Sequence, residues 1–158
     1  MQARNVIAAR CDHPLLVQKK PIRATQLAEY PWIAPPENSP LRSDLQTSLL
    51  AAGLQNIKIA YSGAGLAGQL NYLKNSDCLT VLPHGVVIEL RHQREVTALP
   101  FPLTAPVRSL GLLSKKKLLR APVTSLLEKH FISEFELIST LIRRDESTVL
   151  WGNSSGTV

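Results

Sequence analysis

Short apolar runs alternate with helix patterns along most of this chain, and this alternation restricts the possible folds more than any other feature. The apolar runs that are typical of strands lie at 5–9, 32–34, 57–61, 78–82 and 95–100. Alternation of this kind favours an α/β layer fold with a largely parallel sheet. The 158 residues, 44% of them hydrophobic, suffice for one domain with a core or for one and a half lobes of something larger.

The clearest helix signal follows a proline-rich turn. Ser39 can accept a hydrogen bond from a first-turn N–H, and Pro40 suits the first helical position because it has no N–H to leave unpaired. Leucines then recur every four residues, and Gly53 follows as a stop signal. The pattern predicts a helix over 40–52. Shorter helices are predicted at 24–30, after residue 65, and after residue 85.

A break with three prolines at 100–106 separates the last part of the chain. A strand at 107–114 and a long amphipathic helix at 121–142 are predicted beyond it. The residues expected to form the buried stripe of this helix are Leu127, Phe131, Phe135 and Ile138.

Gly63, Gly65 and Gly68 have the spacing of a dinucleotide-binding turn. Such a turn also needs an acidic residue about 20 positions later, at the end of the next strand, to bind the ribose. Pro83 and His84 stand there instead. We therefore interpret the glycines as small residues that let a helix begin close against the sheet.

Three successive strands run directly into helix starts, at Ser39, at Ser62 to Gly65, and at His84 to Gly85. In a parallel sheet these starts must lie along one edge, where the strands end. Backbone N–H groups at helix starts favour anions and polar oxygens, so a small carboxylate, phosphate or polyol is the expected ligand. Each serine could also be only a helix cap, so the ligand role depends on their convergence.

Evidence for catalysis is weak. His84 follows a strand end and precedes a glycine, which favours a cleft-edge or surface position over a catalytic one. No nucleophile elbow, pair of carboxylates or metal-spaced His and Cys cluster accompanies it, so we expect no catalytic residue, metal or cofactor. Cys11 and Cys78 are interpreted as reduced thiols, with Cys78 in the core.

The formal charge is +6 and the isoelectric point is near 9.6, which would suit a nucleic-acid binder. The basic residues are scattered, however, and no DNA-binding motif accompanies them. No apolar run is long enough to cross a membrane and no signal peptide is evident, so a cytoplasmic protein without a membrane partner is expected.

The order of several motifs resembles the effector-binding region of LysR-type transcriptional regulators, most closely the branch of the galactose-binding-protein regulator. The resemblance spans roughly residues 4 to 135. It is carried by "VIAARCDHPLL" (6–16), "LAEYPWIAPPENSPLRSDLQTSLLAAGL" (27–54), "SDCLTVLP" (76–83) and "VRSLGLLSKKK" (107–117).

This resemblance implies an α/β, periplasmic-binding-protein-like (type 2) fold, in which two lobes hold a small-molecule effector in the cleft between them. One complete Rossmann-like effector-binding lobe with its entry strand would occupy 1–103, the returning strand and long helix of the other lobe 104–143, and a flexible tail 144–158. The cleft wall implied for this chain consists of Pro35, Pro36, Asn38, Ser39, Ser62, Gly63, Pro83 and His84.

A full regulator of this kind begins with a winged helix-turn-helix, and none precedes Met1. We therefore expect DNA binding only through a helix-turn-helix domain absent from this chain. The strand at 107–114 and the helix after it would lose their sheet partners. They are expected to pair with another copy of the chain, as a homo-oligomer, or with a separate piece of the same regulator.

The leading hypothesis is a sensory module that binds a sugar, a sugar acid or another small carboxylate and performs no chemistry. The surplus of positive charge slightly favours an anionic effector. One alternative is a small α/β nucleotide-binding protein or enzyme that uses the Gly63-Gly65-Gly68 turn and His84. Another is a stand-alone interaction protein with the same fold.

Overall fold

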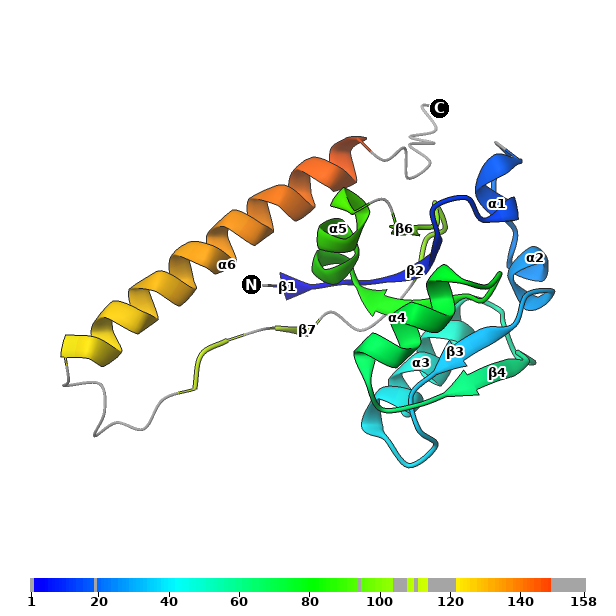
Figure 1. Ribbon diagram of the computed structural model, residues 1–158, viewed down its shortest axis with the longest axis horizontal. Coiled ribbons are helices and arrows are strands. Elements are labelled where there is room, and N and C mark those ends of the chain that lie inside the picture. The colour runs from blue at the N-terminus through cyan, green and yellow to red at the C-terminus, as the bar shows by residue number, and fades with distance from the viewer. Residues whose placement is uncertain are drawn as a thin grey trace, which may run out of the picture.

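The computed structural model describes residues 2–18, 20–93, 95–103, 108–109, 111–113 and 122–148 (Figure 1). The strands are β1 (Gln2–Ala3), β2 (Asn5–Arg10), β3 (Trp32–Ala34), β4 (Ile59–Ser62), β5 (Thr80–Pro83), β6 (Val96–Ala98) and β7 (Arg108–Ser109). The helices are α1 (Pro14–Val17), α2 (Ala24–Ala28), α3 (Pro40–Ala51), α4 (Leu66–Lys74), α5 (His84–His92) and α6 (Pro122–Thr148). None of the described helices is both long and apolar enough to span a membrane.

A three-stranded sheet, β5-β2-β6, and the pair β3-β4 lie side by side, which gives the overall strand order β4-β3-β5-β2-β6. β3 and β4 pair in parallel, and a parallel bridge between Trp32 and Leu79 joins β3 to the start of β5. β2 lies between β5 and β6 and is antiparallel to both. Four strands therefore run in one direction, and β2 runs in the other.

The prediction of a largely parallel sheet is thus right for β3, β4 and β5 and wrong for β2. The neighbours of β2 lie far away in the sequence, since Val6 faces Leu82 and Ala8 faces Ala98. Strand and helix patterns are local, and they do not fix the direction of a strand whose partners arrive more than 70 residues later.

Two apolar layers cover the sheet. Successive residues of a strand point to opposite faces, so Ile7 joins one cluster and Val6 the other. The first cluster includes buried leucines of α1, α2 and α3, and the second includes Leu73 of α4 and Val87 of α5. The central strand β2 is buried on both faces, as the interior of a three-layer α/β arrangement requires.

Helix α3 begins and ends as its sequence predicts. The Ser39 hydroxyl oxygen accepts a hydrogen bond from the backbone N–H of Leu41 at 3.2 Å, with Pro40 at the first position. Gly53 has φ +82°, a left-handed conformation that favours glycine, and the N–H of Leu54 donates to the carbonyl of Leu49 at 2.8 Å. These bonds fix both ends of the helix that borders the candidate site.

The C-terminal part differs from expectation. Of the strand predicted at 107–114, Arg108–Ser109 forms β7, antiparallel to β1, and residues 107, 110 and 114 lie outside the described residues. Helix α6 continues to Thr148, so residues 144–148 are helical and the predicted tail begins too early. The remainder of that tail, 149–158, lies outside the described residues.

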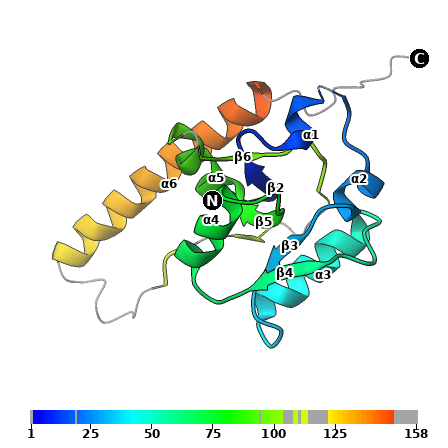
Figure 2. The same cartoon turned by 45° about the vertical axis from the view of Figure 1, so that its right-hand side comes forward.

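Within the described residues, the C-terminal half of α6 packs on α5. The Ile138 and Ile142 methyl groups lie 3.6 Å from the position that a Cβ would occupy on Gly85 of α5. Leu127 and Phe131, predicted as buried, are 50% and 44% exposed. The first half of α6 extends beyond α5, which has nine residues, in both views (Figures 1 and 2).

Candidate functional site

Strands β3, β4 and β5 run in the same direction and end at one edge of the sheet. Ala34 at the end of β3 pairs with Ser62 at the end of β4, and the N–H of Gly63 donates to the carbonyl of Ala34 at 3.3 Å. β5 is aligned with β3 through the bridge from Trp32 to Leu79. The predicted convergence is therefore present: α3, α4 and α5 all begin at this edge, which we call the strand-end edge.

The carbonyl oxygen of Pro35 holds two elements of this edge together. It accepts hydrogen bonds from the Ser62 hydroxyl at 3.2 Å and from Nη1 of Arg42 at 3.1 Å. Pro35 and Pro36 are half-buried, and Asn38 is exposed. These contacts fix the turn between β3 and α3 against the end of β4.

The helix starts at the edge are not alike. Ser39 caps α3, which confirms the simple cap interpretation for that serine, whereas Ser62 lies in β4 and caps no helix. Helix α4 begins after Gly65 and α5 after Pro83, and neither residue supplies a side-chain cap. The N-cap residues of α4 and α5 therefore contribute no side-chain cap, and the first N–H of α5, that of His84, donates to the backbone carbonyl of Arg4 instead.

His84 does not lie where the sequence suggested. Its side chain is 2% exposed, so the prediction of a cleft-edge or surface imidazole is wrong. Its backbone N–H donates to the carbonyl of Arg4 at 2.8 Å, which ties the start of α5 to the segment between β1 and β2. The exposed residue at this corner of the edge is Pro83.

The glycine turn is filled by a side chain of the same protein. A Cβ on Gly63 would stand 2.7 Å from the hydroxyl oxygen of Tyr61, and one on Gly68 would stand 3.0 Å from it. The Tyr61 ring stacks on Tyr72 with centroids 5.2 Å apart. Gly63 and Gly68 thus make room for an aromatic ring, and that ring occupies space that a nucleotide phosphate would approach.

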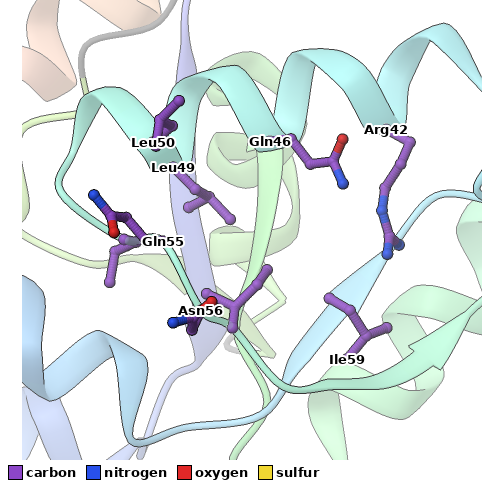
Figure 3. A pocket seen from close by; sticks show the side chains of 9 residues that line it. Arg42, Gln46, Leu49, Leu50, Gln55, Asn56 and Ile59 are labelled. Carbon is purple, nitrogen blue, oxygen red and sulfur yellow. The ribbon is translucent and has the colours of Figure 1, made fainter.

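A separate pocket of about 390 Å³ lies between α3 and the segment that leads into β4 (Figure 3). Its polar lining consists of Arg42, Gln46, Gln55 and Asn56. Its apolar lining consists of Leu49, Leu50, Leu54, Ile57 and Ile59. None of the eight residues predicted for the cleft wall lines this pocket, and the pocket itself was not predicted. The nearest signal was the polar pair Gln55 and Asn56 between a helix stop and a strand.

No structural role was predicted for His13. The ring is fully buried: Nδ1 accepts from the backbone N–H of Leu15 at 3.2 Å, and Nε2 lies 3.2 Å from the carbonyl of Asp77. This arrangement requires the neutral ring with its hydrogen on Nε2, and burial lowers the pKa of His13. His13 caps α1, a structural role that its place before Pro14 could have indicated.

Within the residues that the structure describes, no group of three or more His, Cys, Asp or Glu side chains is placed to hold a metal ion. Cys78 is buried and Cys11 half-buried, and both are free thiols, as predicted. Burial is the main cause that raises the pKa of Cys11.

The family model described as "LysR substrate binding domain" matches residues 1–135. The chain is 31% identical over 118 residues to the HTH-type transcriptional regulator GalR of Pseudomonas putida. That match covers 74% of this chain and 29% of GalR, so the chain spans less than a third of this relative.

Two solved structures have a similar fold. A transcriptional regulator from Vibrio parahaemolyticus has a TM-score of 0.66 at 13% identity, over 89% of this chain and 64% of that one. The CcmR regulatory domain from Synechocystis PCC6803, solved in complex with 2-PG, has a TM-score of 0.57 at 19% identity, over 84% of this chain and 63% of that one. At these identities the likeness shows the fold alone.

Proposed function

The chain belongs to the LysR substrate-binding domain family, and from this membership we propose that its strand-end edge forms one wall of an effector site. It is the effector-binding domain of a LysR-type regulator, as the resemblance in its sequence motifs predicted. Its α/β fold is of the periplasmic-binding-protein-like (type 2) kind, which confirms the predicted fold class.

One observation carries the proposed site: three parallel strands end together, and two of the helices that follow have no side-chain cap. Uncapped helix starts present N–H donors and the positive end of the helix dipole. In open α/β sheets, ligands bind outside the carboxyl ends of the strands. The proposed wall consists of Pro35, Pro36, Asn38, Ser39, Ser62, Gly63 and Pro83. The buried His84, which was predicted for the wall, is not part of it.

We propose a small polyol or carboxylate, such as a sugar or sugar acid, as the effector. Polar oxygens suit the N–H donors and hydroxyls of this wall, and the net charge of +6 favours an anion. The 2-PG complex of the CcmR regulatory domain shows that a domain of similar fold binds a small molecule. No catalytic step is part of the proposal.

In the proposed regulator, the effector binds one arrangement of two lobes better than another and so shifts their populations. Residues 1–103 would supply one lobe with its entry strand. Residues 104–143 would supply the returning strand and the long helix of the other lobe. DNA contact would come from a helix-turn-helix domain outside this chain. Since the matched relative is a transcriptional regulator, we place this function in the cytoplasm.

The exposed face of α6 supports a homo-oligomer. Val123, Leu126 and Leu127 are 68%, 70% and 50% exposed, and further apolar residues follow on the same helix. Apolar surface of this extent on a single helix favours burial against a partner. We propose that a second copy of the chain covers it.

A nucleotide-binding protein or enzyme is the second candidate, and the filled glycine turn disfavours it. Thermal-shift screening against sugars, sugar acids, amino acids and dinucleotides separates the two. Stabilisation by a small polyol or acid supports the sensor, because a ligand that binds only the folded state raises the melting temperature. Stabilisation by NAD or FAD alone would contradict it.

A further inference from the structure

The pocket between α3 and the segment 54–59 lies outside the proposed effector wall, although the two touch at Pro35. Arg42 of the pocket and Ser62 of the wall both donate to the carbonyl oxygen of Pro35, at 3.1 and 3.2 Å. We propose that this pocket is a second small-molecule site, which takes a monocarboxylate with a short apolar body. This proposal does not depend on the effector site, so either of the two sites can be refuted while the other stands.

The floor of the pocket is apolar, and the protein core holds its side chains in place. Leu49 and Leu54 are 1% and 4% exposed and belong to the main core, so the sheet and α3 fix their positions. Ile57 and Ile59 are half-buried and pack against the same core. The volume of about 390 Å³ lies within the range of small-ligand pockets, so the floor can cover a short alkyl or aryl group.

The polar end of the pocket carries one positive charge. The bond from Nη1 to Pro35 orients the Arg42 guanidinium and uses one of its five N–H donors. No carboxylate is present among the nine lining residues, so the lining itself does not neutralise this charge. Figure 3 shows the Gln46 amide on the same side of the pocket as Arg42. A guanidinium held in this way suits a carboxylate.

The combination of lining residues selects among ligand classes. A phosphate dianion would have to give up hydration beside five aliphatic side chains while meeting one arginine, which is unfavourable. A neutral polyol would leave the guanidinium without a counter-charge and the aliphatic floor without an apolar partner. A monocarboxylate with an apolar body satisfies both ends.

The test uses the full chain, labelled with ¹⁵N, and hexanoate as the probe. The side-chain amides of Gln46, Gln55 and Asn56 report the pocket, and backbone amides at Ser62 and Gly63 report the effector wall. We expect saturable shifts that are largest at the three pocket amides, with a roughly millimolar Kd because the probe is small. Hexanol, the neutral counterpart, should bind about tenfold more weakly, since it cannot pair with the guanidinium.

Two variants remove the charge match. Arg42→Gln deletes the positive charge of the pocket. Gln46→Glu keeps Arg42 and places a negative charge beside its guanidinium. Each single variant should weaken hexanoate binding about tenfold or more. Arg143→Gln, the same change at an exposed arginine of α6, is the matched control and should leave the Kd unchanged. Circular dichroism melting confirms that each variant is folded.

Several outcomes would overturn the proposal. These are non-saturable shifts, shifts largest at Ser62 and Gly63, equal affinity for hexanoate and hexanol, or a Kd unaltered in both folded variants. Shifts confined to the effector wall would overturn the second site and still support the proposed function, so the two failures are distinguishable.

Discussion

The hydroxyl oxygen of Tyr61 lies 2.7 Å from the position that a Cβ would occupy on Gly63. Cε1 and Cζ of the same ring, which is stacked on Tyr72, lie 2.9 and 3.0 Å from that position, so the ring would have to shift. Gly63→Ala should therefore destabilise the protein by about 1 to 3 kcal/mol through overpacking. This exceeds the gain of about 0.4 to 1 kcal/mol that alanine brings by restricting the unfolded chain. Urea denaturation measures the difference.

Gly65→Ala is the matched control for this prediction. Gly65 belongs to the same turn, but nothing lies within 4 Å of a Cβ built there. Its replacement should cost less than that of Gly63, because the loss of glycine at the N-cap of α4 is partly offset by the restriction of the unfolded chain. Equal losses in the two variants would mean that Tyr61 is not the reason for glycine at position 63.

Gly53 ends α3 with φ +82°, a conformation that side chains with a Cβ disfavour. Gly53→Ala should cost about 1 kcal/mol. Gly53→Asn should cost less, because asparagine tolerates the left-handed region better. Thermal and urea unfolding of both variants test this order, and a more stable alanine variant would argue against a left-handed end to α3.

The buried His13 should make stability depend on pH. Its pKa in the folded protein is lowered by burial from the ordinary value of 6.5, although the carbonyl of Asp77 opposes this shift. As the pH falls below 6.5, the unfolded chain takes up a proton that the folded chain resists. The stabilisation is therefore fully present above the unfolded pKa and is lost as the pH decreases. Asp12 and Arg10 also face this ring, with opposite effects on its pKa.

His13→Asn removes the titrating ring and retains a residue that caps helices well. The loss of unfolding free energy between about pH 7 and about pH 5 should be smaller in this variant than in the wild-type protein. Urea titrations across this range supply the comparison. Identical pH profiles would show that His13 does not contribute to the acid sensitivity.

The exposed half of α6 should mediate self-association. Charged groups placed in its apolar face by Leu127→Glu together with Phe131→Glu should shift the protein toward monomer. Ser133→Glu, at an exposed polar position of the same helix, should not. Analytical ultracentrifugation at micromolar concentration distinguishes the species. A wild-type protein that sediments as a monodisperse monomer would refute the proposed homo-oligomer.

Local signals predicted the local parts of this fold. The Ser39-Pro40 start and the Gly53 stop predicted a helix over 40–52, and α3 spans Pro40–Ala51. The strand predicted at 32–34 is β3. The shared edge of β3, β4 and β5 followed from general rules for parallel sheets. These features depend on neighbours in sequence, which is why patterns detect them.

Features that depend on distant residues were missed. The direction of β2 is set by pairing with β5 and β6, and the burial of His84 depends on packing around the start of α5. The apolar spacing of α6 predicted a buried stripe, but spacing does not reveal whether a partner layer is present at Leu127 and Phe131. The pocket beside Arg42 arises where α3 and the approach to β4 meet, and neither segment marks it alone.

The central claim is that the strand-end edge of β3, β4 and β5 contacts the effector. The most direct measurement is a backbone amide chemical-shift titration of the full chain with gluconate, malate, glucose and NAD. We predict saturable binding of at least one of the first three compounds, with the largest shifts at Asn38, Ser62 and Gly63. Binding of NAD alone, or the absence of any saturable shift at these residues across the panel, would contradict it.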